Sequence, residues 1–162
     1  MRNSKLIAPC GMNCSLCAAY QRVKNKCMGC NAHGQHKANH CAVCGIKNCE
    51  ELLRAKSHFC YSCGKFPCKR IRQMDIRYRT KYGMSMIQNL QTIQERGIHT
   101  FMAMEKRKWT CHQCGSFLCV HWGQCLQCGN RNDKYPRAAH SPTACSRPGQ
   151  RRNPHGAERP RI

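Results

Sequence analysis

Apolar side chains recur at helical spacing in one stretch of the chain, between residues 69 and 108. Ile71, Met74 and Tyr78 stand at positions i, i+3 and i+7, with arginines and lysines around them. Such a stripe predicts an amphipathic helix that buries its apolar face. Pro67 is placed to start this helix, because proline suits the first turn.

Two further helices are predicted downstream. Ser85 is followed three residues later by Gln88, a capping box that marks a helix start. Apolar residues then recur as far as Ile93, and Gly97 is a suitable residue for ending the helix. Another helix is expected over residues 98–106, with its apolar side chains facing inward.

Outside this stretch, cysteines rather than apolar periodicity organise the chain. Eleven of the 17 cysteines lie between residues 10 and 68. Short helices are expected over residues 18–20 and 50–56, and a solvated, histidine-bearing linker over residues 31–40. The repeated Cys-x-x-Cys pairs are typical of metal sites, because zinc takes four sulfur or nitrogen ligands in a tetrahedron.

The N-terminal pairs predict more than one metal centre. Two pairs, at 14–17 and 27–30, can close one site of four thiolates. The spacing Cys-x2-Cys-x15-Cys-x2-Cys over residues 41–63 predicts a second site. Three cysteines are left over, so two or three centres are expected and their partition stays open. The predicted N-terminal ligands are Cys10, Cys14, Cys17, Cys27, Cys30, Cys41, Cys44, Cys49, Cys60, Cys63 and Cys68.

A separate metal site is predicted near the end of the helical stretch. Cys111, Cys114, Cys125 and Cys128 follow the spacing Cys-x2-Cys-x10-Cys-x2-Cys, with a glycine after each pair. This is the pattern of the two facing knuckles of a zinc ribbon, with room for a small hairpin over residues 117–122.

Three other metal-binding side chains are surplus to this set. Cys119 and His121 lie between the two pairs. They are expected either to contact the metal ligands from outside the coordination sphere or to be exposed. Cys145 stands alone in a proline-rich basic segment and is expected to be a free thiol.

Composition makes metal binding necessary for folding. Leu, Ile, Val and Phe number 22 of 162 residues, and the formal net charge is +21. So few large apolar side chains beside so much like charge would otherwise predict disorder. A structural zinc site contributes about 10–16 kcal/mol of apparent binding free energy, which is also folding free energy.

Disulfides are the alternative use of the cysteines, and they require an oxidising compartment. The N-terminus has no apolar run typical of a signal peptide. No stretch reaches the roughly 20 apolar residues of a membrane span. A soluble cytoplasmic protein with its thiolates on metal, and with no membrane partner, is therefore expected.

Enzymatic chemistry is poorly supported by the residues. The spacing of Cys10, Cys14 and Cys17 matches the cluster motif of radical S-adenosylmethionine enzymes, but nothing here alternates strand and helix as their barrel does. No Cys-x-x-Cys pair is followed by histidine, which excludes c-type haem attachment. None of the seven acids stands in a zinc-hydrolase motif, so no catalytic residue is predicted.

These observations predict a small, metal-stabilised α+β fold. Its parts are a cysteine-rich module of zinc knuckles over residues 1–70, a helical segment over 71–108, a zinc ribbon over 109–129 and a disordered basic tail over 130–162. Three to four zinc ions are expected from sixteen clustered cysteines at four per site.

The role predicted on this basis is a non-enzymatic zinc-binding module that docks on nucleic acid or on an acidic protein. Basic side chains attract phosphates, and aromatic side chains stack on bases. An iron–sulfur protein that transfers electrons or senses oxidants is the alternative, because closely spaced cysteine triplets also hold clusters. The predicted nucleic-acid contacts are Arg70, Arg72, Arg77, Tyr78, Arg79 and Lys81.

Several of these motifs together resemble a known family, domain of unknown function 3795, over residues 6–129. The matching motifs are Ala8-Pro9-Cys10-Gly11, Cys27-Met28-Gly29-Cys30, Phe66-Pro67-Cys68, residues 77–83 and the predicted ribbon with Val120-His121. The resemblance implies a cysteine-rich, zinc-binding domain and no particular reaction. The histidine-bearing linker and the basic tail depart from the family, so the resemblance implies nothing about them.

Overall fold

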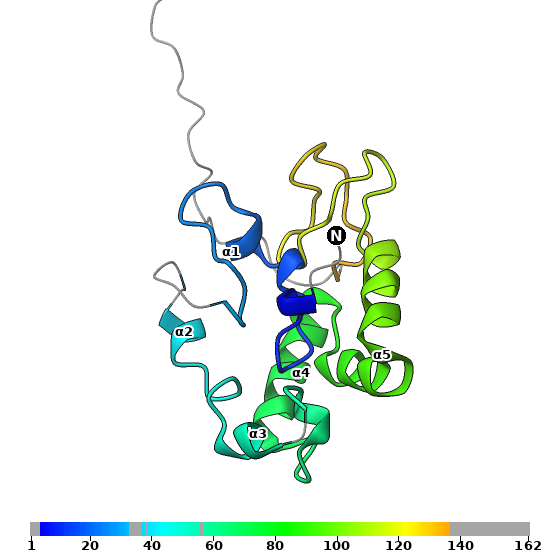
Figure 1. Cartoon of the computed structure of the whole chain (residues 1–162). Coiled ribbons are helices and arrows are strands. Elements are labelled where there is room, and N and C mark those ends of the chain that lie inside the picture. The colour runs from blue at the N-terminus through cyan, green and yellow to red at the C-terminus, as the bar shows by residue number, and fades with distance from the viewer. Residues whose placement is uncertain (1–3, 33–36, 38, 56, 137–162) are drawn as a thin grey trace, which may run out of the picture.

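The computed structural model describes residues 4–32, 37, 39–55 and 57–136 (Figure 1). Helices make up most of the regular secondary structure in these residues. Five are α-helices: α1 (Ala18–Gln21), α2 (Asn39–Ala42), α3 (Glu50–Arg54), α4 (Lys69–Tyr82) and α5 (Met86–Lys108). Three 3-10 turns complete them, η1 (Ser4–Leu6), η2 (Cys14–Leu16) and η3 (Cys60–Ser62).

The junction between α4 and α5 confirms the predicted start of the second helix at Ser85. The Ser85 hydroxyl oxygen accepts the Gln88 backbone N–H at 3.1 Å, as expected for a helix cap. The buried Asp75 carboxylate on α4 accepts the Ser85 hydroxyl at 2.6 Å and the Ile87 N–H at 3.1 Å. A carboxylate at a helix N-terminus is favoured by the helix dipole, so Asp75 fixes the start of α5 against α4.

Gly97 interrupts the long α5 helix where a helix end was predicted. Its φ of 76° and ψ of 159° are non-helical, so residues 86–96 and 98–108 form two helical halves that meet at a kink. This positive φ is readily available only to glycine. None of the helices in the described residues, α5 included, has the length and apolar composition needed to span a bilayer.

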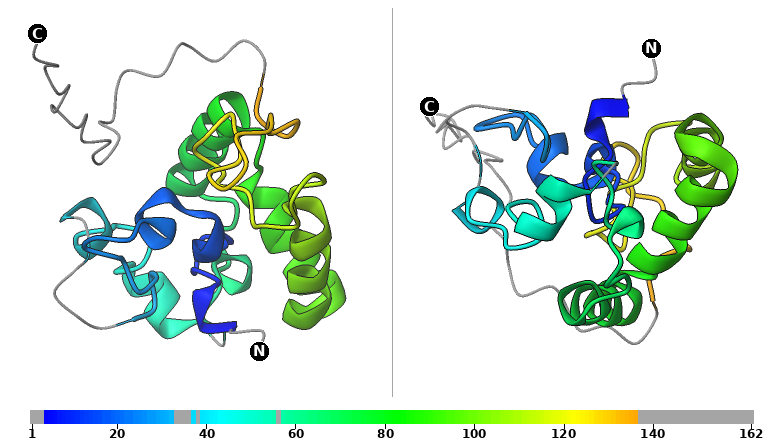
Figure 2. Two further views of the ribbon diagram at one scale, coloured as in Figure 1. Left: turned by 90° about the horizontal axis from the view of Figure 1, so that it is seen from above. Right: turned by 60° about the horizontal axis from the view of Figure 1, so that its bottom comes forward.

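The N-terminal segment, residues 7–16, runs through the middle of the molecule (Figures 1 and 2). It turns back on itself, because the N–H of Ala8 donates to the carbonyl four residues later at 2.8 Å. Gly11 in this turn has φ +84°, and a Cβ there would lie 3.0 Å from the Met86 carbonyl oxygen. The Asn89 side chain donates to the Gly11 carbonyl at 2.9 Å and holds the turn on α5.

Distant parts of the chain pack on this central segment. The N–H of Cys60 donates to the Pro9 carbonyl at 3.0 Å, and the N–H of Val120 donates to the Leu16 carbonyl at 2.9 Å. One hydrophobic cluster contains buried side chains from residues 8–16, 52–71, 84–90 and 109–125. Three of the segments predicted from the sequence therefore contribute to a common core.

The expected α+β architecture is wrong. β-Structure in the described residues is limited to three isolated antiparallel bridges, which pair residues 7 and 13, 110 and 117, and 124 and 131. The hairpin expected over residues 117–122 is not formed, because its donors bond elsewhere. The N–H of Leu118 donates to the Trp109 carbonyl at 2.8 Å, while that of Val120 reaches Leu16.

The fold continues past the predicted start of the basic tail. Asn132 is fully buried, and its side-chain amide donates to the carbonyls of Cys119 at 3.2 Å and Trp122 at 2.9 Å. The Tyr135 ring packs near Tyr82 on α4, with 6.3 Å between the ring centroids. A tail boundary at residue 130 is therefore too early. Residues 137–162, with Cys145, lie outside the described residues.

A buried carboxyl group lies at the end of α5. Glu105 is 3% exposed, and its Oε1 accepts the Trp109 indole N–H at 3.3 Å. Its Oε2 has no hydrogen-bond partner among the described residues. Burial raises the pKa of Glu105 from the ordinary 4.5 to about 7, because the apolar surroundings disfavour the charged form.

This carboxyl group makes stability fall as the pH rises. Between pH 4.5 and 7 the unfolded chain releases the Glu105 proton while the folded chain retains it, so the folded state loses stability. We expect Glu105→Gln to be more stable than the wild type by about 1 kcal/mol near pH 5.5 and about 3 kcal/mol at pH 8. Denaturant unfolding of both proteins across this range measures the difference.

The matched control is Glu95→Gln, which removes an exposed carboxylate from the same helix. The free energy of unfolding of this variant should equal that of the wild type at every pH in the range. An identical gain in both variants would mean that the effect comes from the net charge of the chain and not from burial of Glu105.

Candidate metal centre

Two copies of one turn hold the C-terminal cysteines. In the first turn the N–H of Cys111 donates to the Ser116 carbonyl at 2.8 Å. In the second turn the N–H of Cys125 donates to the Asn130 carbonyl at 2.7 Å. Gly115 and Gly129 each donate back to the first cysteine of their turn at 2.9 Å. Both glycines have φ near +70°, at 71° and 74°, a conformation that side chains disfavour.

The two turns bring four sulfur atoms together. Cys111, Cys114, Cys125 and Cys128, here called the C-terminal thiol cluster, place their Sγ atoms within 4.8 Å of one another. The Sγ separation is 3.7 Å for both Cys111–Cys128 and Cys114–Cys125. Ligands 2.3 Å from a tetrahedral zinc ion lie about 3.8 Å apart. The cluster thus has the dimensions of a four-thiolate zinc site.

Helix α5 positions this cluster against the core. Trp109 is fully buried, and its N–H closes the end of α5 on the Glu105 carbonyl at 2.9 Å. Cys111 follows two residues later and is buried together with Cys125, whereas Cys114 and Cys128 are exposed. One side of the cluster therefore faces the protein and the other faces solvent.

Local donors favour a thiolate at Cys114. The hydroxyl and then the backbone N–H of Ser116 lower the pKa of Cys114 to about 6. Hydrogen bonds to sulfur stabilise its charged form, which is the form that binds metal. Ser116 was not among the predicted site residues, although its position two residues after a Cys-x-x-Cys pair could have indicated such a donor.

The first N-terminal cysteines lie near one another but are more widely separated than the C-terminal thiol cluster. The Cys30 N–H donates to the Cys14 sulfur at 3.3 Å. A hydrogen bond with Cys14, followed by burial, raises the pKa of Cys30. Burial raises the pKa of Cys17, with Cys27 and Cys30 adding to the shift. The proposed Cys14–Cys17–Cys27–Cys30 site stays a prediction.

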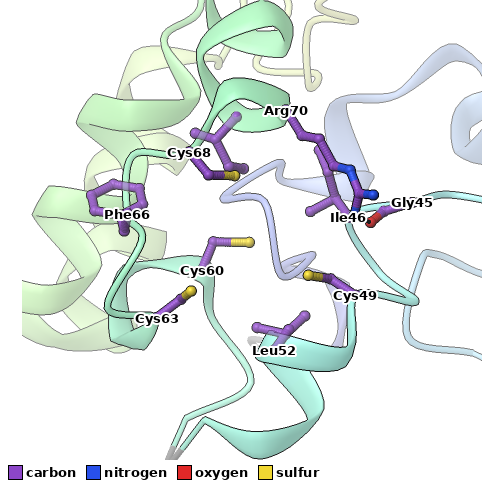
Figure 3. A pocket seen from close by; sticks show the side chains of 10 residues that line it. Gly45, Ile46, Cys49, Leu52, Cys60, Cys63, Phe66, Cys68 and Arg70 are labelled. Carbon is purple, nitrogen blue, oxygen red and sulfur yellow. Dashed lines mark hydrogen bonds between the residues drawn. The ribbon is translucent and has the colours of Figure 1, made fainter.

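Four of the remaining N-terminal cysteines line one cavity. Cys60 and Cys63 line a small cavity with Cys49 and Cys68, two of the cysteines that spacing left over (Figure 3). Residues 41 and 44, the partners that spacing predicted, are not among the residues that line it. The third leftover, Cys10, is buried in the core. None of the sixteen described cysteines forms a disulfide.

Cys119 and His121 are structural rather than exposed. Cys119 is fully buried. His121 accepts the Ala18 N–H on Nδ1 at 3.3 Å, and its Nε2 lies 3.3 Å from the Tyr78 hydroxyl. Burial lowers the pKa of His121 to about 4, so the imidazole is neutral at pH 7. These contacts join α1, α4 and the C-terminal module.

The predicted nucleic-acid contacts on α4 divide into two groups. The five basic side chains, from residues 70 to 81, are all exposed. Tyr78 is not available for base stacking as expected, because its ring packs edge-on against Tyr82 and His121, with centroid distances of 5.1 and 5.8 Å. Two arginines also bond backbone carbonyls, Arg70 to Gly45 at 2.9 Å and Arg72 to Pro67 at 2.7 Å.

The N-terminal part of the chain is similar to a known protein family. A family described as protein of unknown function (DUF3795) matches residues 6–73. The matched segment contains all eleven N-terminal cysteines and the first part of α4, but it ends before the C-terminal thiol cluster. No curated protein and no solved structure matches the chain.

The match separates the part of the chain that is similar to the family from the part that lies beyond it. The matched segment includes the central turn at Gly11 and the four-cysteine cavity. The C-terminal thiol cluster, α5 and Asn132 all follow the matched residues. The resemblance expected as far as residue 129 is therefore found only as far as residue 73.

Removal of two ligands should abolish metal binding at the C-terminal thiol cluster. We expect Cys111→Ser/Cys114→Ser to contain one zinc ion fewer per chain than the wild type, because two thiolates cannot hold zinc as four do. Inductively coupled plasma mass spectrometry of the protein purified under reducing conditions measures this content. Cys119→Ala is the control, since its buried sulfur is outside the cluster, and it should keep every zinc ion.

Proposed function

We propose that this chain is a zinc-stabilised, non-enzymatic module that binds nucleic acid through the exposed basic side chains of α4. The helix carries six such side chains in 14 residues, and none forms an ion pair with another described residue. Its one acid, Asp75, is buried and accepts hydrogen bonds at the start of α5. The basic charge of α4 is therefore not neutralised within the described fold.

The basic side chains lie on both sides of the buried stripe of α4. Residues 70, 77 and 81 follow one another at intervals of seven and four, which places them on one side of the helix. Residues 69, 72 and 79 take the other side at intervals of three and seven. Two parallel basic rows on one rigid helix suit contact with a phosphate backbone, which arginine and lysine neutralise.

The overall charge supports the same kind of partner. The formal net charge is +21, and a zinc ion with four thiolates changes it by −2, to +19 with one site loaded. Such a chain attracts polyanions over a distance set by the salt concentration. Contacts to phosphates carry no sequence information by themselves, so we expect binding with little preference among sequences.

The metal chemistry supports a structural role in place of catalysis. Four thiolates complete the tetrahedral coordination of zinc and leave no position for water or substrate. Zinc thiolates are colourless, so the purified protein should lack visible absorption. A brown protein that contains iron and sulfide would contradict the zinc assignment in favour of an iron–sulfur centre.

Charge removal on α4 tests the nucleic-acid proposal. We expect Arg77→Ala/Arg79→Ala/Lys81→Ala to bind a labelled single-stranded RNA and a DNA duplex more weakly than the wild type. The slope of log affinity against log salt should fall by about 2–3, since each lost phosphate contact removes about 0.7–0.9. Fluorescence anisotropy at several salt concentrations measures both quantities. Arg70 and Arg72 are left in place because they also bond backbone carbonyls.

The control removes the same charge from another helix. Arg96→Ala/Lys106→Ala/Arg107→Ala takes three exposed basic side chains from α5. An equal loss in both variants would mean that the whole surface binds and α4 has no special role. If the wild type binds neither nucleic acid at low salt, an acidic protein replaces nucleic acid as the partner.

A further inference from the structure

Four cysteines from separate parts of the segment that matches DUF3795 surround one small cavity. Cys49 precedes α3, Cys60 and Cys63 belong to the turn at η3, and Cys68 precedes α4. The cavity has a volume of about 30 Å³. Figure 3 shows the sulfur atoms of Cys49 and Cys60 pointing toward each other, with Cys63 and Cys68 on either side of Cys60. The other lining side chains include Leu52, Phe66 and Ile71.

We propose that Cys49, Cys60, Cys63 and Cys68 form a second metal site, which binds one divalent ion of the zinc class. The inference goes beyond the proposed function, because it assigns a ligand set outside the C-terminal thiol cluster. Drug-sized ligands occupy cavities of about 300–1,000 Å³, so this space is too small for an organic molecule. A single ion with sulfur ligands at about 2.3 Å requires far less space.

The backbone around the cavity is already held in place. The N–H of Cys60 donates to the Pro9 carbonyl at 3.0 Å, and that of Cys63 donates to the Cys60 carbonyl at 3.2 Å. The N–H of Cys49 donates to the Ile46 carbonyl at 3.3 Å. Among the described residues only the C-terminal thiol cluster has all its sulfurs within 4.8 Å. Rotation about χ1, the only side-chain torsion that moves sulfur, would bring these four sulfurs closer together around an ion.

The turn at η3 carries the same sulfur-directed donor as the C-terminal turns. The Lys65 N–H donates to the Cys63 sulfur at 3.4 Å, from the second residue after a Cys-x-x-Cys-Gly sequence. Ser116 occupies the equivalent position after Cys114, and its backbone N–H is likewise directed at that sulfur. Bonds of this kind stabilise thiolate ligands from outside the coordination sphere. The Cys60–Cys63 turn thus shares this donor with the C-terminal turns, although its other backbone hydrogen bonds differ, since the Cys60 N–H donates to the Pro9 carbonyl.

Positive charge at the rim compensates the charge of the loaded site. Four thiolates and one divalent ion carry a net −2. Arg70 lines the cavity and is fixed there by its bond to the Gly45 carbonyl at 2.9 Å. The N-terminus of the 14-residue helix α4, whose N-cap is Cys68, also faces the cavity with the partial positive charge of the helix dipole. These groups stabilise the anionic site without competing for the ion, because neither a guanidinium nor an N–H group binds metal.

Thiol protection in the wild-type chain tests the site without any substitution. The full-length protein, loaded with Zn²⁺ under anaerobic reducing conditions, is treated with N-ethylmaleimide, and each cysteine is quantified by peptide mass spectrometry. We expect all four cavity cysteines to react at least about tenfold more slowly than after zinc removal. On titration with a chelator they should lose protection at one common midpoint. Rapid reaction of Cys49 and Cys68 in the loaded wild type would overturn the proposal.

Two single variants distinguish this ligand set from the one that spacing predicts. Cys68→Ser should lose one zinc ion and release Cys49, Cys60 and Cys63 to alkylation, while the C-terminal thiol cluster stays protected. Cys41→Ser is the control and should leave all four cavity cysteines protected. The opposite result, with Cys60 and Cys63 released only by Cys41→Ser, would assign them to the spacing-based site.

The same data separate the failure of this site from the failure of the C-terminal one. If Cys68→Ser exposes every thiol, the variant has unfolded, and the wild-type chelator titration decides alone. A common midpoint for the four cavity cysteines then supports the site, and separate midpoints contradict it. Unprotected C-terminal cysteines in the loaded wild type would instead contradict the zinc scaffold of the proposed function, whatever the cavity cysteines do.

Discussion

Sulfur is the element on which this fold depends. Of the 21 buried hydrophobic residues in the part of the chain that the structure describes, seven are cysteines and three are methionines, so nearly half of this core carries sulfur. Burial raises the pKa of Cys60 and of Cys119 to about 12, so these thiols are neutral unless a cation compensates a thiolate. A divalent ion reverses this preference at any site where four sulfurs converge. The places where several thiols converge are therefore the places where a bound metal ion can link parts of this small chain.

The central N-terminal segment connects the cysteine-rich parts to one another. Its carbonyl groups accept hydrogen bonds from Cys60, from Asn89 and from Val120, which belong to three distant parts of the chain. Just after it, the Ala18 N–H binds the neutral imidazole of His121. The turn at η3 and the C-terminal module are thus attached to the same part of the chain. Stabilisation of either turn contributes to the common core, because folding of a small unit is cooperative.

The sequence predicts the local structure well where one local rule decides it. The apolar stripe of α4, the Ser85 cap and the break at Gly97 were all expected and are all present. The C-terminal thiol cluster was expected because its two pairs are close in sequence and each is closed by its own turn.

The expected hairpin was wrong because Leu118 and Val120 bond to other segments, a tertiary effect that periodicity does not report. The pairing of Cys60 and Cys63 with Cys41 and Cys44 stays a prediction from spacing. Spacing does not indicate that Cys49 and Cys68, which precede α3 and α4, line the same cavity as Cys60 and Cys63.

The kink in α5 has a geometric consequence for the C-terminal module. Residues 98–108 rise about 16 Å along the helix axis, so they act as a lever arm between the bend and Trp109. A Cβ at Gly97 would meet no atom within 4 Å, so backbone torsion and not steric packing requires glycine there. The backbone torsions of Gly97 set the direction of residues 98–108. This direction determines whether His121, which follows the end of α5, can accept the Ala18 N–H at the start of α1.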